Sequence, residues 1–317
     1  MTVFRELRAQ RSTVRSASSA SSAKQPADKK DNLAAYVFLA PWVVGLLVIT
    51  IGPMAASFVL GFTDYNLLQP PEWVGFDNFV RMLSDERLHH ALGVTFTYVL
   101  VSVPLQLALA LLLAVVLDRG VRGMAFYRSI FYLPSLLGSS VAIAILWQRV
   151  FGSDGLVNKF LAVFGIPGRG WISEPGTALS TLVVLNVWTF GAPMVIFLAG
   201  LRQIPAMFYE AAAVDGAGTL RRFRSITLPL LTPIIFFNLV LQIIHAFQAF
   251  TQAFVVSNGT GGPSDSTLFF TVYVYQRGFG NFDMGYASAM AWLLLVIVAA
   301  FTAINFFAAR YWVFYDD

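Results

Sequence analysis

The sequence contains no cysteine among its 317 residues, so the chain can form neither a disulfide nor a cysteine-based metal site. Charged residues are also scarce, at 12% of the chain, whereas hydrophobic residues make up 57%. Soluble domains are usually about 25% charged and about 45–50% apolar. The composition therefore indicates an integral membrane protein. Its basic runs are short and border apolar segments, so no nucleic-acid partner is expected.

Common signatures of hydrolytic enzymes and nucleotide-binding proteins are missing. The sequence has no HExxH or GxSxG pattern and no GxxxxGK[ST] phosphate-binding loop. We therefore expect no enzymatic activity in this chain and no nucleotide bound through a P-loop. A channel is also disfavoured, because no segment resembles a selectivity filter.

Six stretches lack Asp, Glu, Lys and Arg and are long enough to cross about 30 Å of hydrocarbon, which takes about 20 helical residues. They are Leu33–Phe62, Ala91–Leu117, Ser129–Gln148, Ala178–Leu201, Ile226–Ser264 and Met284–Ala309. Turn residues in "SNGTGGPS" predict that the fifth helix ends near Phe250–Val256. Because the stretches are apolar on nearly every face, we predict an all-α membrane protein with six transmembrane helices.

The chain divides into three predicted parts. Residues 1–32 are polar, Ser/Ala-rich and aperiodic, and we expect a disordered cytoplasmic tail. Residues 33–62 form the first transmembrane helix, and residues 91–309 form a five-helix core with a cytoplasmic loop at 202–227. No signal peptide is expected, because no apolar stretch follows the basic start until Leu33.

The basic residues predict the orientation of the chain. With a cytoplasmic N-terminus, 15 of the 21 Lys and Arg residues fall in cytoplasmic segments. The positive-inside bias thus places both termini, and residues 202–225, in the cytoplasm.

The energy source is expected to lie in another chain. The six stretches contain no acidic or basic residue that could relay ions, although His245 could titrate there. A secondary transporter that uses His245 therefore stays open as an alternative. The leading interpretation is a transporter held from the cytoplasm by a separate ATP-hydrolysing subunit.

A polar island, EAAAVDGAGTLRRFRSITLPLLTP, occupies residues 210–233 between two apolar stretches. Glu210-Ala211-Ala212, Gly216 and the Ile-x-Leu-Pro sequence at 226–229 match all seven fixed positions of the EAA loop that bacterial ABC import permeases carry. The island resembles that loop. Its residues predict two short helices joined at Asp215-Gly216, where glycine permits a positive φ. We expect the arginines at 221, 222 and 224 to sit at the lipid headgroups.

The resemblance implies roles for individual residues. In the family this loop is a coupling helix seated in the ATPase subunit, and its acid pairs with an arginine there. Carried over, the coupling residues are Glu210, Ala211, Ala212, Asp215 and Gly216.

The resemblance extends from about residue 34 to the C-terminus. Segments such as "FLAPWVVGLLVITIGPMAASFVLGFTDYN" and "FYRSIFYLPSLLGSSVAIAILWQRVFGSDGLVN" are similar to carbohydrate-uptake permeases of the maltose and glycerol-3-phosphate type, in particular the first of their two permease subunits. One departure is Thr251, where many relatives have an aspartate, so details of solute recognition are expected to differ.

Membership of this family implies the type I ABC importer permease fold and the bacterial cytoplasmic membrane. The chain would pair with a second permease subunit, two ATP-binding subunits that hold ATP and Mg, and an extracytoplasmic solute-binding protein. It would hold no cofactor itself. Its expected cargo is a sugar, a di- or oligosaccharide, with glycerol-3-phosphate as an alternative.

Polar residues in the fifth stretch are the main candidates for a solute pathway. Asn238, Gln242, His245, Gln248 and Gln252 fall within an arc of about 120° on a continuous helix. Amides facing lipid are costly, so this stripe should face protein or a watery cavity. Hydrogen bonding between helices is the alternative role. Asn186 and Thr189 in the fourth stretch are weaker candidates.

Overall fold

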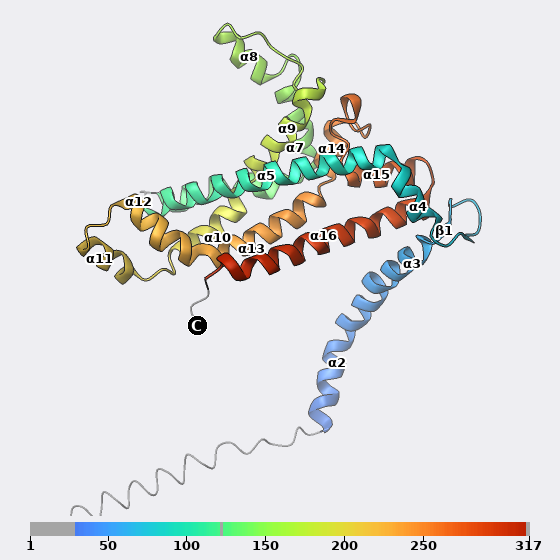
Figure 1. Ribbon diagram of the computed structural model, residues 1–317, viewed down its shortest axis with the longest axis horizontal. Helices are drawn as coiled ribbons and strands as arrows, with labels where there is room; N and C mark the ends of the chain where they lie inside the picture. Colours follow the sequence, from blue (N-terminus) through green and yellow to red (C-terminus); the bar gives the residue numbers. More distant parts are fainter. Residues whose placement is uncertain (1–28, 121–122, 315–317) are drawn as a thin grey trace, which may run out of the picture. The chain divides into compact units, whose positions relative to one another are not determined.

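A computed structural model describes residues 29–120 and 123–314, and nearly all of this part is helical (Figure 1). Of the predicted tail at 1–32, residues 1–28 lie outside the described residues. The chain divides into two compact units, residues 1–56 and 57–317.

The first unit contains the first predicted transmembrane segment. Helix α2 (Lys29–Gly45) continues through a π-helical turn, η1 (Leu46–Ile51), into α3 (Gly52–Leu60), which crosses into the second unit. The helical stretch Tyr36–Leu60 has 25 residues and is apolar enough to span a membrane. Pro41 is accommodated inside α2.

The second unit begins with a short antiparallel hairpin, in which Thr63 pairs with Trp73 and Asp64 with Glu72. The hairpin strands are β1 (Thr63–Asp64) and β2 (Glu72–Trp73), and they are followed by α4 (Asp77–Ser84), α5 (Glu86–Asp118), α6 (Met124–Leu137), α7 (Val141–Phe151), α8 (Leu156–Val163), α9 (Pro175–Trp188), α10 (Gly191–Leu201), α11 (Ala206–Val214), α12 (Thr219–Arg222), η2 (Phe223–Thr227), α13 (Leu228–Phe247), α14 (Thr251–Val256), η3 (Pro263–Asp265), α15 (Phe270–Tyr275), η4 (Gln276–Gly280) and α16 (Met284–Trp312).

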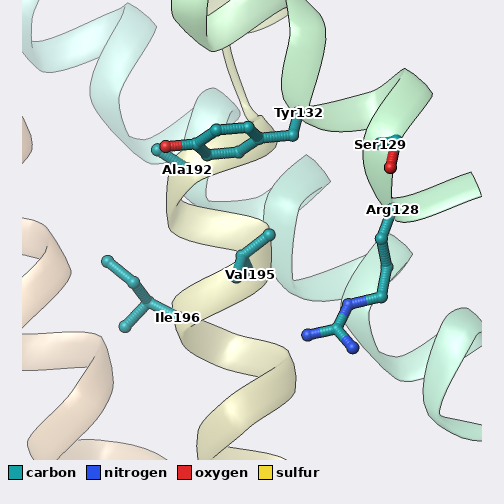
Figure 2. A pocket seen from close by; sticks show the side chains of 6 residues that line it. All are labelled: Arg128, Ser129, Tyr132, Ala192, Val195 and Ile196. Atoms are coloured by element: carbon teal, nitrogen blue, oxygen red, sulfur yellow. The ribbon is translucent and has the colours of Figure 1, made fainter. Parts of the chain in front are cut away.

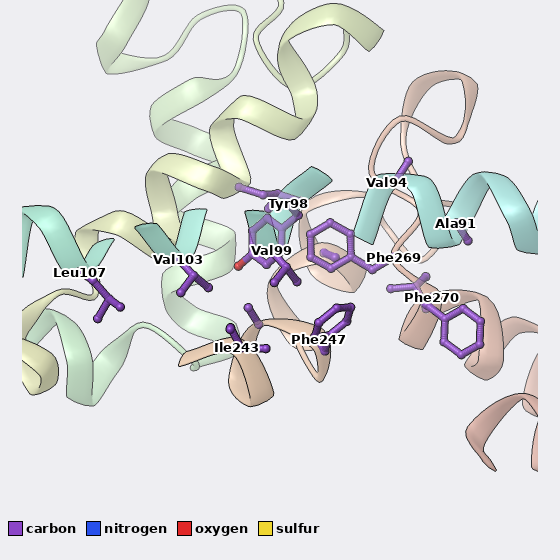
Figure 3. Close-up of a cluster of buried hydrophobic side chains, with 14 of the residues drawn as sticks. Ala91, Val94, Tyr98, Val99, Val103, Leu107, Ile243, Phe247, Phe269 and Phe270 are labelled. Atoms are coloured by element: carbon purple, nitrogen blue, oxygen red, sulfur yellow. The ribbon is translucent and has the colours of Figure 1, made fainter. Parts of the chain in front are cut away.

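Helix α5 is the centre of the second unit. Helices α9, α10 and α13 pack against it, and α16 packs against α13 (Figure 1). Figure 3 shows Val99 and Val103 of α5 pointing towards Ile243 and Phe247 of α13, and all four side chains are buried. This apolar core holds the helices together and positions the polar groups described below.

The fold class is confirmed, but two of the six predicted spans are pairs of helices bent by more than 40°. Among the described residues, four helices are long and apolar enough to cross a membrane. The third predicted span is a bent pair, Met124–Leu137 and Val141–Val163, at 97°, and the fourth is Pro175–Trp188 with Gly191–Leu201, at 41°. In the first pair, the Ser140 hydroxyl accepts from the Ile143 amide at 3.3 Å and so starts a new helix.

Candidate functional site

The predicted docking loop, residues 202–227, forms two short helical segments joined by a tight turn. Helix α11 ends at Val214, and α12 begins at Thr219. Gly216 lies between them with φ of +71°, a conformation that glycine adopts without strain. The sequence expectation for this turn agrees with the structure.

The five residues carried over from the family lie together on α11 and the turn. Glu210, Ala211, Asp215 and Gly216 are exposed, and Ala212 is half-buried. Apolar side chains beside them are exposed as well, namely Met207 (66%), Leu220 (70%) and Val214 (89%). Exposed apolar groups rimmed by polar ones are typical of a protein-binding surface.

Two hydrogen bonds fasten the 202–227 loop to itself. The hydroxyls of Tyr209 and Thr227 lie 2.9 Å apart and join α11 to η2. Arg222 Nε donates to the Ala217 carbonyl at 2.7 Å. Arg222 therefore closes the turn through its Nε, and the arginines at 221 and 224 are exposed; contact of the three arginines with lipid headgroups stays a prediction.

A second polar region lies where three helical pairs are interrupted. We call it the broken-helix layer: residues 138–140 between α6 and α7, 189–190 between α9 and α10, and 248–250 between α13 and α14. Gln252 Nε2 donates to the Gly138 carbonyl at 3.0 Å, and Ser135 Oγ donates to the Thr189 carbonyl at 2.8 Å. These bonds bring the three interruptions side by side.

Close packing against Thr189 explains one glycine of this layer. A Cβ added to Gly138 would overlap Cγ2 of Thr189, so a larger residue would push the two breaks apart. Helix α6 rises about 21 Å over its 14 residues, which is less than the roughly 30 Å of a hydrocarbon layer, so α6 alone is too short to cross it. Irregular backbone within a membrane is tolerated where it is buried in protein or lines a watery cavity.

Gln106 on α5 completes this layer and was not among the predicted residues. Its Nε2 donates to the carbonyl and hydroxyl oxygens of Thr189, at 3.2 and 3.0 Å, and its Oε1 accepts from Asn186 at 3.4 Å. Gln106 is 2% exposed. One signal could have found it, because it is the only amide in the stretch Ala91–Leu117.

The predicted stripe on the fifth span is not carried by one continuous helix. Its geometry assumed a continuous helix, but α13 ends at Phe247, before Gln248 and Gln252. Asn238 is fully buried, and its Oδ1 has no hydrogen-bond partner among the described residues. Gln242 is half-buried, whereas His245 and Gln248 are exposed. Within the described part of the chain, Gln252 is the one residue of the stripe whose side chain hydrogen-bonds in the broken-helix layer, where those of Asn186 and Thr189 also do.

A pocket of about 350 Å³ opens on the α6 and α10 side of this layer, at the halves nearer the predicted cytoplasmic face. Figure 2 shows its lining, with the Tyr132 ring reaching towards Ala192 and Arg128 one turn before it on α6. The lining is mostly apolar, and Arg128 is its charged member.

The predicted extracytoplasmic end is closed by charged and phenolic groups. Asp85 caps α5 and accepts from the hydroxyls of Tyr273 (2.7 Å) and Tyr286 (2.8 Å) and from Arg277 Nη2 (3.3 Å). Burial opposes ionisation of Asp85, but these donors outweigh it and lower the pKa of its carboxyl. The carboxylate therefore stays ionised and ties together segments 188 to 201 residues apart.

Two further ion pairs surround this carboxylate. Arg87 donates to both carboxylate oxygens of Asp265, at 2.8 and 2.9 Å, and Arg81 pairs with Asp283 at 2.8 Å. The hydrogen bond from the guanidinium lowers the pKa of Asp265, with burial acting against it.

Comparison with known families identifies the chain. Residues 90–313 match the family described as "Binding-protein-dependent transport system inner membrane component". The chain belongs to this family. It is accordingly a multi-pass inner membrane protein and a non-catalytic permease subunit of a carbohydrate-uptake ABC transporter, as the sequence predicted.

Several curated members of this permease family are similar over almost their whole length. The probable ABC transporter permease protein YesP of Bacillus subtilis (strain 168) is 53% identical over 291 residues, covering 91% of this chain and 94% of the relative. The lactose transport system permease protein LacF of Rhizobium radiobacter is 32% identical, with 87% and 93% covered. The trehalose/maltose permease MalF of Thermococcus litoralis is 31% identical, with the same coverage.

Among solved structures, this permease resembles a bacterial ABC transporter that imports the acidic polysaccharide alginate. The TM-score is 0.79 at 24% identity, over 89% of this chain and 97% of the other. The match confirms the importer permease fold. Members of the family work in a complex with a binding protein and other transporter subunits.

Proposed function

We propose that this chain is one of two unlike permease subunits of an ATP-driven importer and that it passes a di- or oligosaccharide into a bacterial cell. The observation that carries the proposal is the exposed 202–227 loop, whose sequence matches the coupling loop of import permeases. Its exposed Glu210 and the neighbouring Val214, 89% exposed, offer a carboxylate and an apolar contact to an ATP-binding subunit.

The loop connects directly to the polar centre of the bundle. From Thr219, α12, η2 and α13 follow one another without a non-helical residue, as far as Phe247. A displacement of the loop by the ATPase would therefore reach the broken-helix layer along one helical element. Interrupted helices at membrane depth are where transporters commonly hold their solute.

The chemistry of the layer suits an uncharged polyol. Gln106, Asn186 and Gln252 can donate to hydroxyls and accept from them. Relatives named for lactose, for trehalose and maltose, and for arabinooligosaccharides are 31–32% identical to this chain, and they favour a sugar over glycerol-3-phosphate. A secondary transporter driven through His245 does not fit a family of binding-protein-dependent components.

The complete transporter would contain this chain, a second permease, two ATP-binding subunits that bind ATP and Mg, and an extracytoplasmic binding protein. Both termini of this chain would face the cytoplasm, where most of its basic residues fall. This orientation places Asp85 and its network at the outer face.

Binding-protein-stimulated ATP hydrolysis by the reconstituted complex tests the coupling role. Glu210→Ala should lower this hydrolysis about tenfold, because the loop loses its exposed carboxylate, while the subunits still copurify. Glu86→Ala changes an exposed acid at the other end and should leave hydrolysis unchanged. Equal stimulation in wild type and Glu210→Ala would overturn the assignment of the loop. Uptake of labelled lactose, maltose, trehalose and glycerol-3-phosphate into the same vesicles separates the sugar from the phosphate ester.

A further inference from the structure

A separate pocket of about 470 Å³ lies at the predicted extracytoplasmic end, away from the broken-helix layer. It is bounded by Arg87 at the start of α5, the turn Asn258–Thr260 after α14, and the segment Tyr273–Asn281 of α15 and η4. Its size falls in the usual range for small-molecule sites, about 300–1,000 Å³. Neither the family match nor the sequence patterns assign a role to it.

Two aromatic side chains form one wall of the pocket, and they are part of a row of four contacting rings. Phe254 and Tyr275 line the pocket and lie 5.0 Å apart, edge to face. Phe250 stacks on Phe254 at 5.0 Å, and Phe279 stacks on Tyr275 at 5.2 Å. Tyr275 is 40% exposed and Phe279 61% exposed. Rings left open in this way offer an apolar face on which a sugar ring can lie.

Polar groups converge on the same space. Gln276 Nε2 donates to the Gly259 carbonyl at 2.7 Å, while its buried Oε1 has no partner among the described residues. The Asn258 amide oxygen accepts from Gln148 at 3.3 Å, which leaves its NH₂ group available. Asn281 lines the pocket from the opposite segment. The pocket therefore presents hydrogen-bond donors from Asn258 and both donors and an acceptor from the Asn281 amide.

The two charged residues of the lining, Arg87 and Arg277, already donate hydrogen bonds to other residues of the chain. Arg87 donates through Nε and Nη2 to Asp265, and Arg277 uses the same two nitrogens for Tyr273 and Asp85. In the described part of the chain, Nη1 of each arginine has no partner. A free phosphate would need unpaired cations, whereas paired arginines with a spare N–H suit a hydroxyl.

The turn that frames the pocket is held in a constrained shape. Asn258 has φ of +52° and Gly259 of +75°, and the Gly259 amide donates to the Phe254 carbonyl at 2.7 Å. A positive φ at a non-glycine residue persists only where the surroundings fix it. Here Gln148 and Gln276 provide that support, so the pocket is formed before any ligand arrives.

We infer that this pocket is an outer subsite for one sugar ring of the incoming solute, stacked on Tyr275 and hydrogen-bonded by Asn258, Gln276 and Asn281. The inference rests on the proposed sugar import. Phe250, at the other end of the aromatic row, belongs to the broken-helix layer. A sugar released at the outer face would thus meet a ring-binding surface that leads to the interrupted helices.

The first test measures uptake kinetics of the reconstituted complex with lactose, maltose, trehalose and arabinotriose. For the sugar that the wild type transports, Tyr275→Ala should raise KM about tenfold, equivalent to about 1.4 kcal/mol. Tyr275→Phe keeps the ring and should retain most of the affinity. Phe282→Ala, an exposed ring outside the lining, should leave KM unchanged. Wild-type KM in Tyr275→Ala complexes that assemble normally would contradict the subsite.

The second test does not depend on transport. Because the chain has no cysteine, Asn281→Cys places a single thiol at the pocket, and its labelling by a water-soluble maleimide can be followed in this subunit of the assembled complex. At least one of the same four sugars should slow labelling several-fold. Mannitol, a linear polyol without a ring, should not.

The two tests separate the subsite from the proposed function. Protection of the thiol by a sugar in a complex without uptake would support the subsite and count against sugar import. Uptake with no protection by any of the four sugars would overturn the subsite and leave import standing.

Discussion

At the predicted extracytoplasmic end, Asp85 accepts hydrogen bonds from two tyrosines and an arginine, whereas Glu210 in the 202–227 loop has no side-chain partner among the described residues. The outer end joins α5, α15, η4 and α16 through buried or half-buried groups. The cytoplasmic loop is held by two local bonds, Tyr209–Thr227 and Arg222–Ala217, and it leaves Val214 almost fully exposed.

This difference shows at which end the acidic side chain already has its hydrogen-bond partners within the chain. The charged groups of the Asp85 network pair with one another, so this network needs no other chain to keep its shape. The 202–227 loop has a defined backbone but unpaired charge and exposed apolar side chains, which are typical of a protein-binding surface. The following predictions are ordered by the size of the expected effect.

Gly216→Pro should have the largest effect on transport. Proline requires φ near −65°, whereas this residue has φ of +71°, so the turn cannot form. ATP-dependent uptake should fall to background while the outer end stays folded. Gly218→Ala is the matched control, since this glycine has φ of −71° and open space around it. Normal uptake by Gly216→Pro would contradict the role of the loop.

Asp85→Asn should weaken the outer end. The neutral amide accepts fewer hydrogen bonds and leaves Arg277 without its acidic partner, so we expect a loss of about 2 kcal/mol in stability. Thermal unfolding in detergent measures the change. Glu86→Gln alters the adjacent, exposed acid and should have little effect. Equal melting temperatures for the two variants would show that the network is not stabilising.

Gln106→Leu should affect the broken-helix layer more mildly. The variant loses two hydrogen bonds to Thr189, although the Thr189 carbonyl keeps its bond from Ser135. We expect about 1 kcal/mol less stability and a several-fold lower maximal uptake rate. Gln203→Leu, at an exposed site in the cytoplasmic loop, serves as the control. An unchanged uptake rate in Gln106→Leu would exclude this glutamine from the pathway.

The smallest expected effect is the pH dependence of stability that comes from Asp265. The pKa of Asp265 is lowered by Arg87, so its contribution to stability is present above the unfolded pKa, about 3.9, and is lost as pH falls through the folded pKa. The pair is partly exposed, and its contribution should be below about 1 kcal/mol.

Melting temperatures between neutral pH and about pH 3 test this contribution. Asp265→Asn should show a smaller decrease than the wild type over this interval, because it lacks one of the titrating carboxyls. An equal decrease in both proteins would show that the Arg87–Asp265 ion pair does not contribute to the pH dependence of stability.

The sequence predicted the cytoplasmic loop well because its information is local. Seven fixed positions lie within 20 residues, and the Asp215-Gly216 turn follows from the conformational freedom of glycine. The helical class was equally accessible, since apolar length and composition largely determine it, and the family followed from the resemblance at the seven matched positions.

The broken-helix layer and the outer network were not predictable in the same way. An uncharged run such as Ser129–Gln148 looks like one helix, and the 97° bend depends on bonds to other segments, including Gln252 to Gly138. Asp85 finds its donors at positions 273, 277 and 286 only after folding. The angles of the stripe on the fifth span assumed a helix that continues past Phe247, where α13 ends; its role in a solute pathway stays a prediction.

The most direct test of the central claim is a site-specific crosslink between the 202–227 loop and an ATP-binding subunit. The chain lacks cysteine, so Val214→Cys carries the only thiol of this subunit, and a short bifunctional maleimide can join it to a cysteine in the ATPase. We predict a crosslinked product with Val214→Cys and none with Gln69→Cys, an exposed site in the first outer loop. A crosslink from Gln69→Cys to the ATPase, or none from Val214→Cys in an assembled complex, would contradict the account.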